Sequence, residues 1–205
     1  MQSLLVATGN RGKLSEIKSL LDDINITLLT PEMIAIHLDV EENGDTYQEN
    51  ASFKARAFAR SSGLVTMADD SGLEVDALGG LPGIHSARFS PLPNATDADR
   101  RAYLLNILHG HPRPWTAHFH CTVAIATPEE RMYYAQANCP GEVIPVERGT
   151  NGFGYDPIFL IPEIGLTMAE LSMTEKNHLS HRARAVKAAV PILLTILRKP
   201  STDTP

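Results

Sequence analysis

The order of strand-like and helix-like segments limits this chain to a fold that combines both. Residues 3–8 are a short run of small and β-branched residues, typical of a buried strand, and 26–29 form a second such run. Between them, residues 13–21 place apolar side chains three and four positions apart, which predicts a helix. Further on, 116–126 alternates apolar with polar or small residues, and 131–138 follows a Pro-Glu-Glu turn, as in a hairpin. This arrangement predicts an α/β fold with a mixed sheet.

Helix start signals and strand propensity predict the remaining elements. Thr96 and Thr167 each precede an acidic residue three positions on, the pattern of a capping box at a helix start. Ser180 is a natural N-cap for the last helix, which we expect Pro191 to kink or split. The other expected segments are an irregular acidic stretch at 30–48, a helix at 49–61, strands at 64–68 and 73–77 around an Asp-Asp turn, and a loop at 79–95.

Composition narrows the class of protein. The 205 residues suit one domain, which we place at 1–199 with a frayed tail at 200–205. A formal net charge of −6 argues against a surface that binds long nucleic acid, but a small anionic ligand needs only a few local cations. Two cysteines, Cys121 and Cys139, make no disulfide framework. With no apolar run long enough to span a bilayer and no signal-like amino end, we expect a cytoplasmic protein without membrane partners.

Residues 66–72, Thr-Met-Ala-Asp-Asp-Ser-Gly, are the first candidate for chemistry. A carboxylate at the end of a strand can hold a divalent cation or accept a proton from water. Because successive side chains of a strand point to opposite faces, we expect only one of Asp69 and Asp70 to face a common pocket. The alternative is a turn rich in Asp, Ser and Gly, which requires no chemistry.

Residues 7–13, Ala-Thr-Gly-Asn-Arg-Gly-Lys, predict an anion site where a strand turns into a helix. The amides and dipole at a helix N-terminus attract phosphate, and Lys13 adds a full charge. A Walker motif would need Gly at Ala7 and Ser or Thr at Leu14, so that interpretation fails. The alternative is a capped turn with a solvated lysine. Basic residues in a first turn oppose the dipole, however, which favours the anion.

An acidic pair and a lysine form the next candidates. Glu41 and Glu42 offer the oxygen ligands that Mg²⁺ prefers, and either could join the Asp pair around a cation. A solvated acidic loop is the alternative. Lys54 shares the helix face of Ala51 and Phe58, which looks buried. It either extends its ammonium group to solvent or contacts a phosphate.

Two late segments combine glycines, aromatic residues and cations. In 149–157, three glycines allow tight bends, and Phe153 or Tyr155 could stack on a nucleobase or fill the core. In 175–182, His181 and Arg182 follow the Ser180 N-cap, where cations are disfavoured unless an anion lies nearby. A basic surface at a helix end is the alternative for this second segment.

His118 and His120 share one face of a predicted strand and could suggest a transition metal. No third ligand is evident near them in the sequence. We therefore favour surface or cross-strand packing for this pair.

Taken together, the motifs resemble the inosine triphosphate pyrophosphatase family, whose members remove ITP, dITP and XTP from nucleotide pools. They occur in the family's order over nearly the whole chain. The matching motifs are Thr-Gly-Asn-x-x-Lys at 8–13, Glu-Asn-Ala-x-x-Lys at 49–54, Ala-Asp-Asp-Ser-Gly-Leu at 68–73, Pro-Gly-Ile-x-Ser-Ala-Arg at 82–88, Gly-Phe-Gly-Tyr-Asp-Pro at 152–157 and Ser-His-Arg at 180–182. The resemblance implies an elongated two-lobed α/β fold around a long mixed sheet with a central nucleotide cleft, a homodimer and a requirement for Mg²⁺.

The resemblance also implies roles for individual residues. Asp70 would be proton acceptor and metal ligand, with Ser71 beside the substrate, and either Glu41 or Glu42 would be the second metal ligand. Lys54 would reach a phosphate. The triphosphate would lie against Thr8, Gly9, Asn10, Arg11, Gly12 and Lys13. The base and sugar would lie against Phe153, Gly154, Tyr155, Asp156, Lys176, His181 and Arg182.

Two other functions fit a nucleotide site. One is an NTPase or kinase that releases or transfers the terminal phosphate, which its product would reveal. The other is a catalytically silent nucleotide-binding module. The carboxylates argue against the silent module, because binding phosphate alone favours donors and cations.

Overall fold

The computed structural model describes residues 2–197, and the tail expected at 200–205 lies outside them. Seven strands form one sheet in the order β2-β1-β3-β4-β5-β6-β7. The strands are β1 (Gln2–Val6), β2 (Ile26–Leu29), β3 (Thr66–Val75), β4 (Trp115–Ala126), β5 (Met132–Val143), β6 (Phe159–Ile161) and β7 (Leu166–Thr167). The α-helices are α1 (Arg11–Leu21), α2 (Tyr47–Ser62), α3 (Asp97–Leu108), α4 (Met173–Leu179) and α5 (His181–Ile196). Short 3₁₀ helices are η1 (Glu32–Ile34), η2 (Asp76–Leu78), η3 (Gly83–Arg88) and η4 (Asp156–Ile158).

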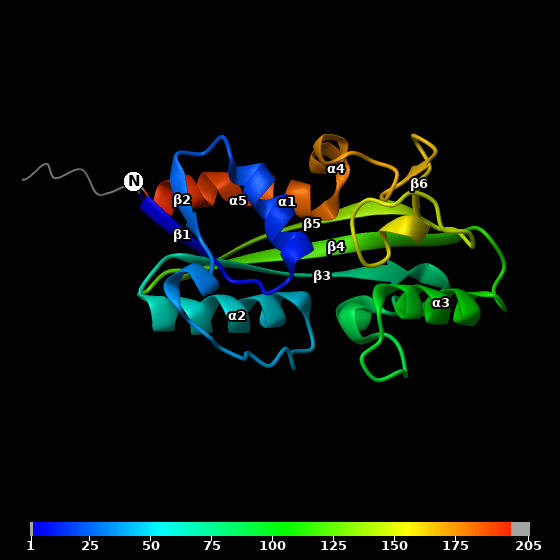
Figure 1. The fold of residues 1–205 in the computed structure, drawn as a ribbon, viewed down its shortest axis with the longest axis horizontal. Coiled ribbons are helices and arrows are strands. Elements are labelled where there is room, and N and C mark those ends of the chain that lie inside the picture. Colours follow the sequence, from blue (N-terminus) through cyan, green and yellow to red (C-terminus); the bar gives the residue numbers. More distant parts are fainter. Residues whose placement is uncertain (1, 198–205) are drawn as a thin grey trace, which may run out of the picture.

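The sheet is mixed, as expected. β1 is parallel to β2 and β3, whereas β3, β4, β5, β6 and β7 pair in antiparallel order. Figure 1 shows an elongated molecule in which α1, α4 and α5 cover one face of the sheet and α2 and α3 cover the other. No helix within residues 2–197 is long and apolar enough to cross a membrane.

Local signals explain most of these elements. Thr96 and Asp99 form the predicted capping box of α3, and Thr46 with Glu49 forms another at α2. The left-handed Gly63 ends α2, a conformation in which glycine has no steric penalty. Helices of the expected type therefore begin near the expected residues.

Packing divides the sheet into three regions. α1 and α5 cover one face through apolar residues such as Ile17 and Val186. The alanines of α2, including Ala51 and Ala55, allow that helix to lie close to the small residues of β3 and β4. A third apolar cluster joins α3 to the other end of the sheet, near β6. The three regions leave the middle of β3 for polar residues.

The expected turn at Asp69–Asp70, with strands on either side, is wrong. β3 runs without interruption through both aspartates, and each of its ten residues pairs with a residue of β4. The reason is tertiary: the long β4 offers a ladder partner at every position, which outweighs the turn preference of Asp, Ser and Gly. The carboxylates therefore lie mid-strand in the centre of the sheet.

Two helix expectations also change. Glu170 does accept the Thr167 amide, but no helix follows, because the next residues pack into the core and their backbone pairs with distant loops. α4 begins instead after Ser172, which forms its own capping box. α5 begins after Ser180 as expected and continues through Pro191 without being split.

Candidate active site

A cavity of about 1150 Å³ opens over the middle of β3. Its walls come from the start of α1, the segment after β2, α2, η3, the start of α3, the loop before η4 and the helices α4 and α5. Sixteen of the residues expected in a nucleotide site line it. They are Thr8, Gly9, Asn10, Arg11, Lys13, Glu42, Lys54, Asp70, Ser71, Phe153, Gly154, Tyr155, Asp156, Lys176, His181 and Arg182.

Two expected residues do not line the cavity. A Cβ on Gly12 would lie 2.5 Å from the ring of Phe153, so this glycine allows α1 to pack against the aromatic side chain. Glu41 is exposed and accepts a 3.4 Å hydrogen bond from Asn43, whereas its neighbour Glu42 lines the cavity. The structure thus separates the two glutamates that the sequence left equivalent.

Asp69 and Asp70 lie on opposite faces of the sheet, as strand alternation predicts. Asp69 points toward α1 and α5, where its Oδ2 lies 3.1 Å from Lys13 Nζ and 3.2 Å from Arg182 Nε. Asp70 points toward α2 and accepts a 3.1 Å hydrogen bond from Asn50. Only Asp70 lines the cavity. One aspartate therefore belongs to the interior of the protein, and the other faces the cavity.

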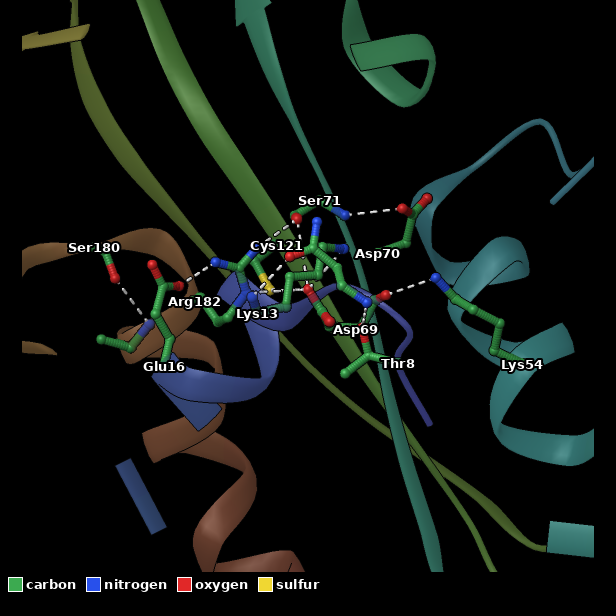
Figure 2. A network of polar contacts seen from close by, with 12 residues as sticks. Thr8, Lys13, Glu16, Lys54, Asp69, Asp70, Ser71, Cys121, Ser180 and Arg182 are labelled. Carbon is green, nitrogen blue, oxygen red and sulfur yellow. Dashed lines mark hydrogen bonds and ion pairs between the residues drawn. The ribbon is translucent and has the colours of Figure 1, made fainter. Parts of the chain in front are cut away.

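A chain of alternating charges runs beneath the cavity from α1 to η4, and Figure 2 shows its first part, from Lys13 to Glu16. Its members are largely buried, and each touches a neighbour of opposite sign. In order, they are Lys13, Asp69, Arg182, Glu16, Lys176 and Asp156. Lys176 Nζ lies 2.7 Å from Glu16 and 2.5 Å from Asp156. This ion chain connects the expected phosphate end of the site to the expected base end.

The ion chain keeps its carboxylates charged. Burial alone would raise the pKa of Asp69, but the charges of Lys13 and Arg182 outweigh it and hold that pKa well below its ordinary value. Burial likewise acts to raise the pKa of Glu16, and the charges of Arg182 and Lys176 lower it overall. Both side chains are therefore anions at neutral pH.

The first turn of α5 contains no unbalanced cation. The Arg182 guanidinium is buried and donates to Glu16, Asp69 and Ser71. Burial, together with the charges of Arg182 and Lys176, lowers the pKa of His181 well below its ordinary value, so the imidazole is neutral. The anions expected near this N-terminus thus include two carboxylates of the protein itself.

Lys54 reaches the cavity from α2. Its Nζ donates to the Asp69 carbonyl oxygen at 2.8 Å and to Glu42 Oε1 at 3.1 Å (Figure 2 shows the former). The buried Asn50, one turn earlier, accepts the Gly44 amide at 2.9 Å and donates to Asp70. α2 therefore fixes both the lysine and the cavity carboxylate.

Of the three carboxylates expected to bind a metal, Glu42 and Asp70 line the cavity and could hold a cation. Burial raises the pKa of Asp70, the charges of Lys54 and Lys13 lower it, Glu42 raises it, and the balance is upward. No cluster of three or more His, Cys, Asp or Glu suited to a metal occurs within residues 2–197. Two carboxylates are nevertheless the usual protein share for Mg²⁺, which keeps several waters and binds substrate phosphates. The residues fit that ion.

The loop before η4 separates its two aromatic residues. Tyr155 is buried in the core near α3 and donates its hydroxyl to the Ser86 carbonyl at 2.9 Å. Phe153 lies at the cavity, with Lys176 Nζ 5.2 Å and Arg182 Cζ 5.5 Å from its ring centre. Of the two, Phe153 is the one free to stack on a base.

His118 and His120 pack across strands, the interpretation that the sequence favoured. His118 Nε2 lies 3.2 Å from Glu74, and the two ring nitrogens of His120 contact Asn138 and Thr122. This pair belongs to the sheet surface rather than to the cavity.

Sequence reasoning missed three residues of the site. Glu16 and Asn50 were assigned no role, and Asp69 was left without one once Asp70 was chosen. A signal was present for Glu16, which follows Lys13 by three positions and sits beside Ile17 on the apolar face of α1. A carboxylate on a buried helix face requires a partner.

Comparison with known proteins agrees with this geometry. A model of the Ham1 family matches residues 4–192. The chain belongs to the Ham1 family. It is 44% identical over 191 residues to a dITP/XTP pyrophosphatase of Desulforamulus reducens, covering 93% of this chain and 94% of that protein. A dITP/XTP pyrophosphatase of Geobacter sulfurreducens is 47% identical over 187 residues, covering 91% and 94% respectively.

The fold of the Ham1 family is shared as well. The structure of a HAM1 protein from Coxiella burnetii superposes with a TM-score of 0.86 at 38% identity, covering 95% of this chain and 100% of that one. The family expected from the ordered motifs is therefore confirmed. The cavity residues from Thr8 to Arg182 all fall within the part that the Ham1 model matches.

The ion chain predicts that Glu16→Gln weakens the fold in a pH-dependent way. At pH 7 we expect the free energy of unfolding to fall by about 3–5 kcal/mol, because two buried cations lose a charged partner. The pKa of Glu16 is lowered in the folded protein, so its stabilisation is present above the unfolded pKa of about 4.3 and is lost as pH falls toward the folded pKa.

Urea unfolding of both proteins from pH 8 to acid pH measures this effect. The difference in the free energy of unfolding between the wild-type protein and Glu16→Gln should narrow only below the unfolded pKa of Glu16. Glu163→Gln, at an exposed position between β6 and β7, is the matched control and should change little. A constant difference across the acid range would contradict the ion-pair explanation.

Proposed function

We propose that this protein hydrolyses nonstandard purine nucleoside triphosphates, ITP, dITP and XTP, between the α- and β-phosphates, and that Mg²⁺ is required. The products are the nucleoside monophosphate and pyrophosphate. One observation supports this function above all: Lys13, Lys54 and Asp70 face the same cavity as Phe153 and Arg182. Cations and a carboxylate for phosphate chemistry thus lie within one space with an aromatic ring for a base. The names of the relatives suggest the substrate class.

The cations of the cavity offset the charge of the triphosphate. Lys13 and Lys54 are only 14% and 13% exposed, so their charges act where water screens them weakly. Arg11 and the free amides at the start of α1 add donors at the same edge. Because water must attack phosphorus against several negative charges, positioning and electrostatics provide most of the catalysis.

Asp70 accepts the proton from the attacking water. Burial raises its pKa in the absence of the ion, and a carboxylate that is ionised at neutral pH can accept a proton without a large shift. The Asn50 amide and the Ser71 backbone N–H hold its two oxygens in place. A base oriented in this way does not have to be reorganised during the reaction.

Glu42 and Asp70 hold the Mg²⁺ ion in this proposal. The ion would offset part of the polyphosphate charge. Lys54, which pairs with Glu42 here, is then available to a phosphate oxygen. The chain would thus provide two acidic ligands beside two lysines, which is the kind of site at which Mg²⁺ also binds substrate phosphates.

Base choice follows from donors and acceptors. Phe153 stacks on the base, and Arg182, which lines the cavity, offers only donors. Hypoxanthine and xanthine present an O6 acceptor, whereas adenine presents an amino donor at that position. Two donors that face each other leave a buried polar group unpaired, which is the basis of strong discrimination.

Pyrophosphate detection across a panel of nucleotides tests the proposed reaction. ITP, dITP and XTP should release pyrophosphate with Mg²⁺, and Asp70→Asn should lower kcat by about 10²–10⁴ because the general base is lost. Asp76→Asn, in η2 just after β3 and outside the cavity, is the control and should retain activity. Release of orthophosphate from ITP, or full turnover by Asp70→Asn, would contradict the proposal.

The two neighbouring glutamates test the metal site. Glu42→Gln should raise the Mg²⁺ concentration for half-maximal activity by about ten-fold or more, since a ligand is lost. Glu41→Gln should leave that concentration unchanged, because Glu41 points away from the cavity. A Mg²⁺ titration of the activity of both variants shows which glutamate is the ligand. If only Glu41→Gln raised the Mg²⁺ concentration for half-maximal activity, the ligand would be Glu41.

A further inference from the structure

Gly154, next to Phe153, is held by α3 through both its backbone N–H and its carbonyl oxygen. Its amide donates to Asp97 Oδ2 at 2.8 Å, and its carbonyl oxygen accepts from Arg101 Nη1 at 2.8 Å. Asp97 and Arg101 are one turn apart on α3 and more than fifty positions from Gly154 in the sequence. Both contacts are therefore long-range, and both act on backbone atoms of the loop.

Other residues brace this contact. Arg101 is only 12% exposed and also holds Glu147 through two hydrogen bonds of 2.8 and 3.0 Å. Asp97 is paired with Arg100 through its other oxygen. Burial acts to raise the pKa of Asp97, but hydrogen bonds from Arg100 and the Gly154 amide lower it overall. The acceptor is therefore charged, and its hydrogen bond to the amide is charge-assisted.

Gly154 needs such support. It has a φ of +61°, and Gly152 has a φ of +75°, so glycines without side-chain packing of their own flank Phe153. On the cavity side, the Phe153 amide donates to Asp156 Oδ2 at 2.9 Å, and the Phe153 carbonyl oxygen accepts from the Asp156 amide at 3.2 Å. Without the α3 contacts, the loop would keep its hydrogen bonds to Asp156 and Ser86 and the packing of the Phe153 ring on Gly12, but Gly154 would lose both of its hydrogen bonds to α3.

We propose that Asp97 and Arg101 are positioning residues, which place the Phe153 ring for base binding by clamping the backbone N–H and the carbonyl oxygen of Gly154. This inference rests on the proposed function, because it assigns the base to Phe153. Asp97 also lines the cavity, whereas Arg101 does not, so the Arg101 variant separates positioning from direct contact with the nucleotide. Their effect passes through the loop, so it should appear in substrate binding and not in the proton transfer by Asp70.

Asp97→Ala tests the clamp by two independent measurements. Hydrogen exchange of the Gly154 amide, followed by NMR in the free protein, should become at least about ten-fold faster, because the only acceptor of that amide is removed. The KM for ITP should rise about ten-fold with the loss of a charge-assisted hydrogen bond, and kcat should stay within about two-fold. Asp97→Asn keeps an acceptor oxygen, so both its amide exchange rate and its KM should be closer to those of the wild-type protein than to those of Asp97→Ala.

Asp99→Ala is the matched control. Asp99 lies in the same first turn but caps α3 without touching the loop. Its loss should lower the thermal midpoint while leaving the KM and the exchange of Gly154 unchanged. Arg101→Met should reproduce the rise in KM by removing the other half of the clamp.

A double-mutant cycle shows whether the effect passes through Phe153. In a Phe153→Ala background, Asp97→Ala should add little to the KM, because the positioned ring is absent. An unchanged KM in Asp97→Ala, an equal increase in the Phe153→Ala background, or an equal effect of Asp99→Ala would overturn the proposal. If the wild-type protein released no pyrophosphate from any nucleotide, the proposed function would fail. The clamp would then be tested without turnover, by the exchange rate of the Gly154 amide and by the dissociation constant for ITP in the same variants.

Discussion

One carboxylate oxygen, Oδ2 of Asp69, joins the parts of this site. It lies on the face of the sheet that α1 and α5 cover, and it contacts Lys13 of α1 and Arg182 of α5. These two helices come from opposite ends of the chain. Removing one partner from a buried ion pair leaves an uncompensated charge, which typically costs about 3–5 kcal/mol. Asp69 therefore helps to hold both cations in the cavity wall, together with Glu16 in the case of Arg182. At the base end of the site, Glu16 and Asp156 balance the buried charge of Lys176 in the same way.

The middle of the sheet makes this arrangement possible. β3 places Asp69 among α1 and α5 on one face and Asp70 beside α2 on the other. A single step along the strand thus separates an acid that holds the walls together from an acid that faces the substrate. Pairing with β4 at every position fixes this alternation, since a slip of one residue would exchange the two roles.

Short-range patterns in the sequence predicted the α/β class, the helix starts at Thr96 and Ser180, and the alternation of β4. They failed where tertiary contacts decide the outcome, as at the aspartates of β3, whose local preference is a turn. The site residues were identified largely by resemblance to a family. Their partners were not, because the contacts of Arg182 with Asp69 and Glu16 join positions 113 and 166 residues apart. No periodicity reaches that far.

A crystal structure with a nonhydrolysable inosine triphosphate analogue and Mg²⁺ tests the central claim most directly. The account predicts the base against Phe153, the phosphates against Lys13 and Lys54, and the ion between Glu42 and Asp70, with the Asp69–Arg182 pair intact beneath them. A nucleotide bound in the reverse direction, or outside this cavity, would contradict it.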